Sequence, residues 1–225
     1  MLKSAWAAAA ASLACVVAFA LLAFLAFHVG PLDRADAHVL GSLSSLEDTA
    51  VGSVASAIAF FADPVPLLII LAGASWYGLR RGRVAETAAA LAVVAGASLT
   101  TQVLKHLLAH ERFHSFLETQ PDLNSLPSGH VTAATSLALA LAWVAPAARR
   151  RAVLAGGALF VLAVGVSMPI LNRHLPSDVL GGILVGLGWG FAVLAVYRAL
   201  LPRFRAGGNP PPTGELRASF SRRCV

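Results

Sequence analysis

The sequence predicts an all-α, polytopic membrane protein whose six transmembrane helices form a bundle. Of its 225 residues, 57% are hydrophobic and only 12% are charged. Mean hydropathy is +0.74. The apolar residues also gather into runs long enough to cross a bilayer, whereas a soluble domain carries far more charge for its length. Composition and run length together therefore favour a membrane-spanning bundle.

The first apolar run covers residues 5–27 and exceeds the core of a cleavable signal peptide, so we expect a retained transmembrane helix. The other spans are expected over residues 65–79, 87–104, 131–148, 152–169 and 179–201. Residues 28–47 turn polar, with a break at Gly30-Pro31, and the small-residue-rich stretch 46–61 is expected along the membrane surface. Residues 1–205 should form one domain, and residues 206–225 a disordered cytoplasmic tail.

Basic residues predict the orientation. The net charge is +6, but the cations stand beside the ends of apolar runs, as topology signals do, and do not indicate nucleic-acid binding. With the N-terminus inside, 13 of the 17 cations are cytoplasmic: Lys3, Arg80, Arg81, Arg83, Arg149, Arg150, Arg151, Arg198, Arg203, Arg205, Arg217, Arg222 and Arg223. The outer side then holds Arg34, Lys105, Arg112 and Arg173. The alanine-rich composition and short loops suggest a bacterial inner membrane.

A polar elbow, Leu126-Pro127-Ser128-Gly129-His130, lies between two apolar runs. Pro127 and Ser128 are helix-start signals, and the first turn of a helix has free backbone N–H groups that bind anions. Gly129 has no side chain to block a ligand, and His130 can titrate near neutral pH. An ordinary capped helix with one interfacial histidine would also fit these residues alone.

Two further outer segments carry matching chemistry. Lys105 and Arg112 are seven residues apart and would share a helix face, where a lysine point charge and an arginine fork suit one phosphate. In the last outer loop His174 precedes Asp178 by four residues, and a carboxylate on one ring nitrogen leaves the other free to attack. Taken singly, these residues also fit interfacial cations and a helix cap.

These segments resemble the type 2 phosphatidic acid phosphatases, a family whose phosphate site is shared with vanadium-dependent haloperoxidases. The chain has Lys105 and Arg112 at the first motif's spacing, Pro127 to His130 intact as the second, and the third motif's spacing at Ser167, His174 and Asp178. The resemblance covers roughly residues 65–201. Two positions depart from it, because Phe113 replaces a proline and Met168 replaces an arginine that binds phosphate.

The resemblance implies a membrane phosphatase with an outer-face phosphate site, no cofactor and no metal. His174 would attack phosphorus to form a phosphohistidine while Asp178 orients its ring. Lys105, Arg112 and the N–H groups around Ser128 and Gly129 would neutralise the phosphoryl oxygens. His130 would protonate the leaving oxygen and then activate water, which predicts a bell-shaped pH profile. We expect Arg173, beside the nucleophile, to replace part of the missing arginine's contact.

Two rival interpretations stay open. His110-Glu111-Arg112-Phe113-His114 fits the H-E-x-x-H pattern of zinc metalloproteases, with His106 one turn earlier, although no third ligand is assigned. The replacement at Met168 also fits a phosphate-lipid binding or transport protein without turnover.

The expected partner is a lipid phosphate or diphosphate, because a site at the membrane interface meets amphiphilic molecules. Phosphatidic acid, phosphatidylglycerol phosphate and undecaprenyl diphosphate are equally open, as are transfer to another lipid and the oligomeric state.

Overall fold

The computed structural model describes residues 4–108 and 126–207, and all regular secondary structure in these ranges is helical. The elements are α1 (Ala5–His28), α2 (Gly30–Ser44), α3 (Ala50–Phe60), α4 (Pro64–Arg80), α5 (Val84–Leu107), α6 (Gly129–Val144), α7 (Arg150–Ile170) and α8 (Pro176–Gly207). The expected all-α class is therefore confirmed.

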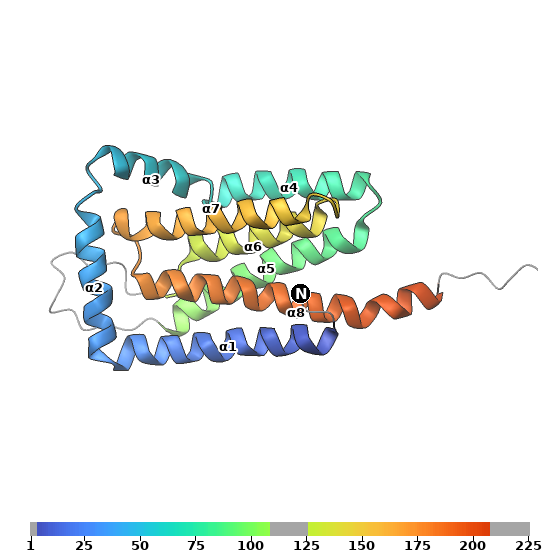
Figure 1. The fold of residues 1–225 in the computed structure, drawn as a ribbon, viewed down its shortest axis with the longest axis horizontal. Coiled ribbons are helices and arrows are strands. Elements are labelled where there is room, and N and C mark those ends of the chain that lie inside the picture. The colour runs from blue at the N-terminus through green and yellow to red at the C-terminus, as the bar shows by residue number, and fades with distance from the viewer. Residues whose placement is uncertain (1–3, 109–125, 208–225) are drawn as a thin grey trace, which may run out of the picture.

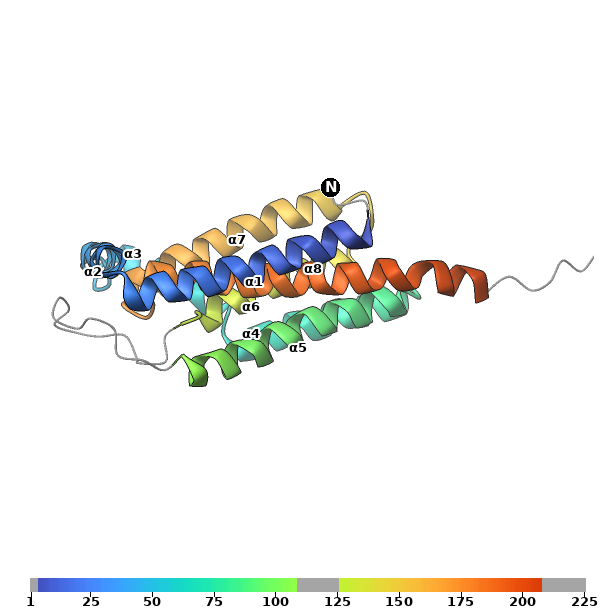
Figure 2. The ribbon, with the colours of Figure 1, turned by 90° about the horizontal axis from the view of Figure 1, so that it is seen from below.

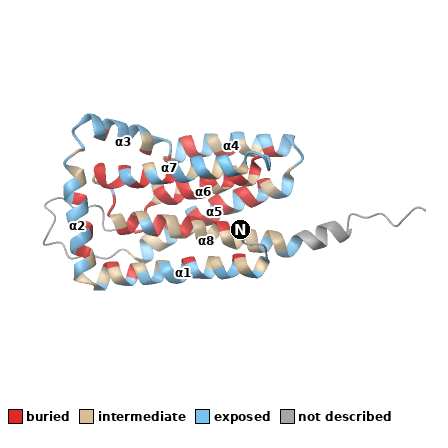
Figure 3. Ribbon diagram, in the orientation of Figure 1, coloured by how far each residue is buried: buried red, intermediate tan, exposed pale blue. Residues whose placement is uncertain are grey.

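The helices α1 and α4 to α8 run along one common direction, whereas α2 crosses one end of the bundle (Figure 1). In the view turned by 90°, α2 is seen nearly end-on, in agreement with this crosswise course (Figure 2). The helix α6 packs against α4, α5, α7 and α8, and α1 packs mainly along α8. Buried residues concentrate on α6, while the outer helices are largely exposed (Figure 3). Many of the exposed side chains on these helices are large and apolar, which suits contact with lipid.

Length and composition identify four helices as candidate spans in the described residues: α1, α5, α7 and the first 25 residues of α8. The helices α3 and α4, bent by 46° at a short break, pass the same test together and give a fifth. The helix α6 is apolar but shorter. The chain is thus an integral membrane protein with four or five such spans, and the count of six stays a prediction.

The expected break at Gly30-Pro31 is wrong, because both residues belong to helix α2. The break is a single residue, Val29, and Pro31 stands in the first turn of α2, where its missing N–H costs nothing. Asp33, Asp36 and Leu40 are buried because their spacing places them on one face of α2. The crosswise helix is therefore α2, whereas α3 packs against α7.

Two helix ends also differ from expectation. The fourth predicted span was drawn to residue 148, but α6 ends at Val144 because Pro146 disfavours helix in the residue before it. The Arg83 guanidinium donates to the carbonyls of Val144 and Ala145 at 2.7 and 2.8 Å and so caps this end. The helix α8 continues to Gly207, past the predicted start of the tail at residue 206. Residues 208–225 lie outside the described ranges.

Glycines on α8 bring it against α6. A Cβ added to Gly182 would lie 2.7 Å from the Ser128 carbonyl oxygen, and one added to Gly186 would lie 2.7 Å from the Thr135 Cβ. Gly182 and Gly186 are one turn apart and therefore lie on the same face. This close approach fixes the start of α6 beside the start of α8.

The bundle separates charge between its ends. Arg80 ends α4, Arg81 and Arg83 follow it, and Arg150 begins α7, and these helix ends lie opposite α2 (Figure 1). The ends of α5 and α7 and the starts of α6 and α8 lie at the α2 end. The candidate histidines and the main arginine cluster therefore lie at opposite ends of the helices.

Candidate functional site

The elbow before α6 forms as its sequence predicts. Ser128 is the N-cap of α6, and its side chain accepts a hydrogen bond from the backbone N–H of Val131 at 3.5 Å. The backbone N–H of Ser128 donates to the carbonyl oxygen of Asp178 at 2.9 Å. This main-chain bond joins two segments that are 50 residues apart in the sequence.

Gly129 is the first residue of α6, and a Cβ added there meets no atom within 4 Å. Open space therefore lies beside free N–H groups of the helix start, as an anion site requires. The histidine of the elbow, His130, follows in the same turn.

Asp178 lies in the first turn of α8, His174 lies in the loop just before this helix, and both are buried. The Nδ1 atom of His174 is 3.6 Å from Oδ2 of Asp178, just beyond hydrogen-bond distance. It has no hydrogen-bond partner among the described residues. Asp178 Oδ2 accepts a hydrogen bond from the backbone N–H of Leu175 at 3.0 Å, which holds the carboxylate in place. Nδ1 therefore points toward Asp178, and Nε2 is the ring nitrogen that could contact a ligand.

The two histidines face each other across the site. Their ring centroids are 6.2 Å apart, and the rings meet edge to face at 66°. They come from the start of α6 and the loop before α8, so the two rings meet only because these two segments lie side by side.

His130 has a partner that the sequence did not reveal. Its Nε2 lies 2.9 Å from Oδ1 of Asp63, the residue between α3 and α4. In the sequence, Asp63-Pro64 indicated only a helix boundary, and the contact spans 67 residues. No local spacing could have found it.

The predicted phosphate-binding cations lie in three different places. Lys105 lies in the last turn of α5, one turn beyond Thr101, whose hydroxyl donates to that of Thr132 on α6 at 3.2 Å. This places Lys105 on the α5 face that contacts α6. Arg173 is exposed beside His174, and its charge acts on His130. Arg112, together with Phe113, lies outside the described residues.

Met168, which stands where the resemblance expects arginine, is fully buried. It belongs to an apolar cluster that includes Ala55 and Ala59 of α3 and Val131 of α6. Its side chain therefore packs in the core instead of offering a charge.

The crosswise helix α2 also reaches the site, which the sequence did not predict. Asp36 is buried, and its Oδ1 accepts a hydrogen bond from the backbone N–H of Ser177 at 3.2 Å. Ser177 is in the first turn of α8, next to Asp178. A carboxylate at a helix start stabilises the unpaired N–H groups there.

The model of the PAP2 superfamily matches residues 86–202 of the chain. The chain belongs to the PAP2 superfamily. It is 30% identical over 181 residues to an Escherichia coli (strain K12) protein named "Putative undecaprenyl-diphosphatase YbjG", covering 75% of this chain and 86% of that protein. Its fold is similar to the crystal structure of a transmembrane PAP2 type phosphatidylglycerolphosphate phosphatase from Bacillus subtilis, with a TM-score of 0.67 and 23% identity. The match covers 82% of this chain and 94% of the other.

Membership of the PAP2 lipid phosphatase family confirms the resemblance drawn from the three motifs. It favours the phosphatase interpretation over the zinc protease. The protease motif, His110 to His114, lies outside the described residues, and no group of three metal-ligating side chains occurs in the part that the structure describes.

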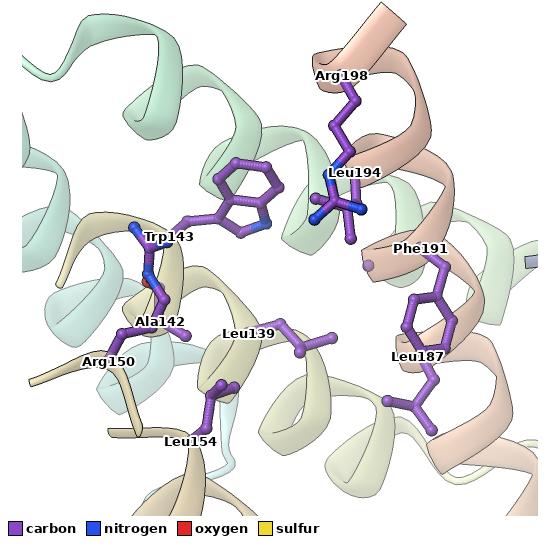
Figure 4. Close-up of a pocket in the computed structure, with 10 residues that line it drawn as sticks. Leu139, Ala142, Trp143, Arg150, Leu154, Leu187, Phe191, Leu194 and Arg198 are labelled. Atoms are coloured by element: carbon purple, nitrogen blue, oxygen red, sulfur yellow. The ribbon is translucent and has the colours of Figure 1, made fainter. Parts of the chain in front are cut away.

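A pocket of about 190 Å³ lies between α6, α7 and α8, well away from the two histidines. Figure 4 shows Trp143 and Leu139 of α6 across from Phe191 and Arg198 of α8. Along α6 these residues lie toward the end away from His130, and along α8 they lie from its middle onward, away from Asp178. The pocket is therefore separate from the candidate site of this PAP2 protein.

Proposed function

We propose that the protein is a membrane phosphatase that hydrolyses a lipid-linked phosphate monoester or diphosphate through a phosphohistidine. The observation that carries this proposal is the pair of imidazoles, His130 and His174, whose centroids are 6.2 Å apart at one end of the bundle. Each imidazole has its own carboxylate nearby, Asp63 for His130 and Asp178 for His174. One histidine can then act as nucleophile while the other carries the proton.

In the first step Nε2 of His174 attacks phosphorus, and the bond between phosphorus and the leaving oxygen breaks. Asp178, close to Nδ1, favours the tautomer with its proton on Nδ1 and stabilises the positive charge that the ring gains. His130 gives its proton to the leaving oxygen. The products of this step are an alcohol or a phosphorylated lipid and the phosphohistidine.

In the second step neutral His130 takes a proton from water, and the resulting hydroxide oxygen attacks the phosphohistidine. The bond from phosphorus to Nε2 breaks, so phosphate leaves and His174 is regenerated. Because His174 must be neutral and His130 protonated at the start, the rate should rise and then fall with pH.

Charge on the phosphoryl oxygens is neutralised by Lys105, Arg112 and the N–H groups around Ser128 and Gly129. The open space at Gly129 supports this role because an oxygen can approach the helix start there. Arg173, exposed beside His174, supplies part of the contact that Met168 cannot make. The scheme needs no metal or cofactor.

The substrate's tail would stay in the bilayer, because the site lies where the apolar helices end. We propose six spans, with the site on the outer face of a bacterial inner membrane, as the distribution of cations favours. The names of the two relatives point to undecaprenyl diphosphate and phosphatidylglycerol phosphate as first substrates to assay.

Phosphate release by purified protein tests the proposal. Phosphatidic acid, phosphatidylglycerol phosphate and undecaprenyl diphosphate should be assayed with the wild type, His174→Ala and Arg173→Ala. We expect His174→Ala to lose at least about 10³-fold in kcat because the nucleophile is gone. Arg173→Ala should lose about 10- to 100-fold in kcat/KM, as expected for one charge-assisted phosphate contact.

Three controls separate the rival functions. Activity that survives a chelator supports the phosphohistidine route, whereas its loss would favour zinc catalysis. A ³²P-labelled phosphohistidine should be trapped with the wild type and be absent from His174→Ala. A folded wild type that binds these lipids but releases no phosphate would instead indicate a binding or transport protein.

A further inference from the structure

Asp63 occupies the N-cap position of α4, where an aspartate ordinarily accepts hydrogen bonds from the helix's own N–H groups. Here its side chain makes no such bond. Its Oδ1 instead lies 2.9 Å from Nε2 of His130, on a different helix. The aspartate is therefore used for a contact with the candidate site, and a structural capping role does not explain it.

The two carboxylate–imidazole pairs of the site differ in exposure. The side chains of His174 and Asp178 are 9% and 0% exposed, whereas those of His130 and Asp63 are 24% and 38% exposed. A nucleophile benefits from exclusion of water, but a proton carrier must exchange its proton with water in every cycle. The more exposed pair is suited to proton transfer.

The geometry points to Asp63 as the positioning residue that orients His130 and favours its protonated form, which enables cleavage of lipid phosphate monoesters. This inference rests on the proposed function. A protonated imidazole carries a proton on each nitrogen. Asp63 accepts the hydrogen bond from Nε2–H, so the proton on Nδ1 is the one transferred to the leaving oxygen.

The charges around His130 show why a carboxylate is needed. Burial is the main cause that lowers the pKa of His130, and the charge of Arg173, together with that of His174 whenever His174 is protonated, lowers it further. Asp63, from the connection between α3 and α4, supplies the opposing negative charge. Removing that charge would leave His130 less often protonated at neutral pH.

The substrate class follows from the leaving group. A monoester of an alcohol releases an alkoxide, a strong base that needs a proton as the bond to phosphorus breaks. A lipid diphosphate releases a phosphate monoester, a weak base that can leave without one. General acid catalysis contributes about 10²- to 10⁴-fold where the leaving group needs it. Asp63 should therefore matter much more for monoesters than for diphosphates.

The test compares wild type and Asp63→Asn on phosphatidylglycerol phosphate and undecaprenyl diphosphate. We expect Asp63→Asn to lower kcat/KM about 10²-fold for the monoester and less than about 10-fold for the diphosphate. The high-pH limb of the monoester profile should move about one unit lower, because His130 loses its proton more easily. Asp63→Glu should bring that limb back while the rate stays reduced.

Asp48→Asn is the matched control, since it makes the same chemical change at an exposed position between α2 and α3. Three results would overturn the inference while leaving the phosphatase intact. They are equal losses of Asp63→Asn on both substrates, an unmoved pH profile, and losses in Asp48→Asn that match those of Asp63→Asn. If Asp63→Asn does not fold, Asp63→Glu decides by the same ratio of losses. A wild type inactive on both lipids would overturn the proposed function, and this inference with it.

Discussion

Gly129 is the residue whose replacement tests the phosphate position most directly. A methyl group there would meet no atom within 4 Å, so Gly129→Ala should fold with an unchanged melting temperature. The same methyl would occupy the space that a phosphoryl oxygen needs beside the helix start. We expect kcat/KM to fall by about 10-fold or more, as loss of a charge-assisted contact implies. Competitive inhibition by vanadate or inorganic phosphate should weaken in parallel, and unchanged inhibition would contradict the placement.

Individual site residues could be predicted where local spacing carries the chemistry. His174, just before α8, and Asp178, in its first turn, are four residues apart, and the elbow from Pro127 to His130 is continuous in sequence. Asp63 and Asp36 could not be predicted in this way, because each acts on a segment more than 60 residues distant. A long-range contact leaves no periodic trace in one sequence.

The contact between α6 and α8 gives a prediction for an element. Gly182→Ala would place a Cβ 2.7 Å from the Ser128 carbonyl oxygen and 3.0 Å from the Thr132 nitrogen, both backbone atoms that cannot move aside separately. We expect a loss of about 1–3 kcal/mol of stability from overpacking, measured by thermal or denaturant unfolding in detergent. Activity should fall even below the melting temperature, because the start of α6 moves relative to α8.

Gly156→Ala on α7 is the control, since nothing lies within 4 Å of its added Cβ. Equal stability of both variants would argue against close α6–α8 packing.

Six of the observed helices overlap the predicted spans because long apolar runs mark them. The helix α2 escaped prediction because Gly30 and Pro31 suggest a break, although proline also suits a first helical turn.

Across the whole molecule, the separation of charges predicts which end faces outward. Ser45 lies at the α2 end and Ala147 between α6 and α7 at the arginine end, and both are exposed. In a Cys224→Ser background, Ser45→Cys should react with a membrane-impermeant maleimide in intact cells. Ala147→Cys should react only after the cells are permeabilised, since the arginine-rich side stays in the cytoplasm.

The reverse labelling pattern would place the site on the cytoplasmic side and contradict the orientation. The order of the predicted spans placed His130 and His174 at the same end of the bundle, because the chain crosses the membrane an even number of times between them. The crossing of α2 over that end could not be predicted, since it depends on buried contacts with α7 and α8.

The bond from the Ser128 N–H to the Asp178 carbonyl oxygen has a consequence for how such sites diverge. It is made by main-chain atoms, and every amino acid except proline provides the N–H, so this link between the two segments does not require a particular side chain at either position. Mutational drift can thus exchange a phosphate-binding arginine for Met168 while the reacting groups keep their spacing. A lineage could change its preferred lipid before it lost the capacity to cleave one.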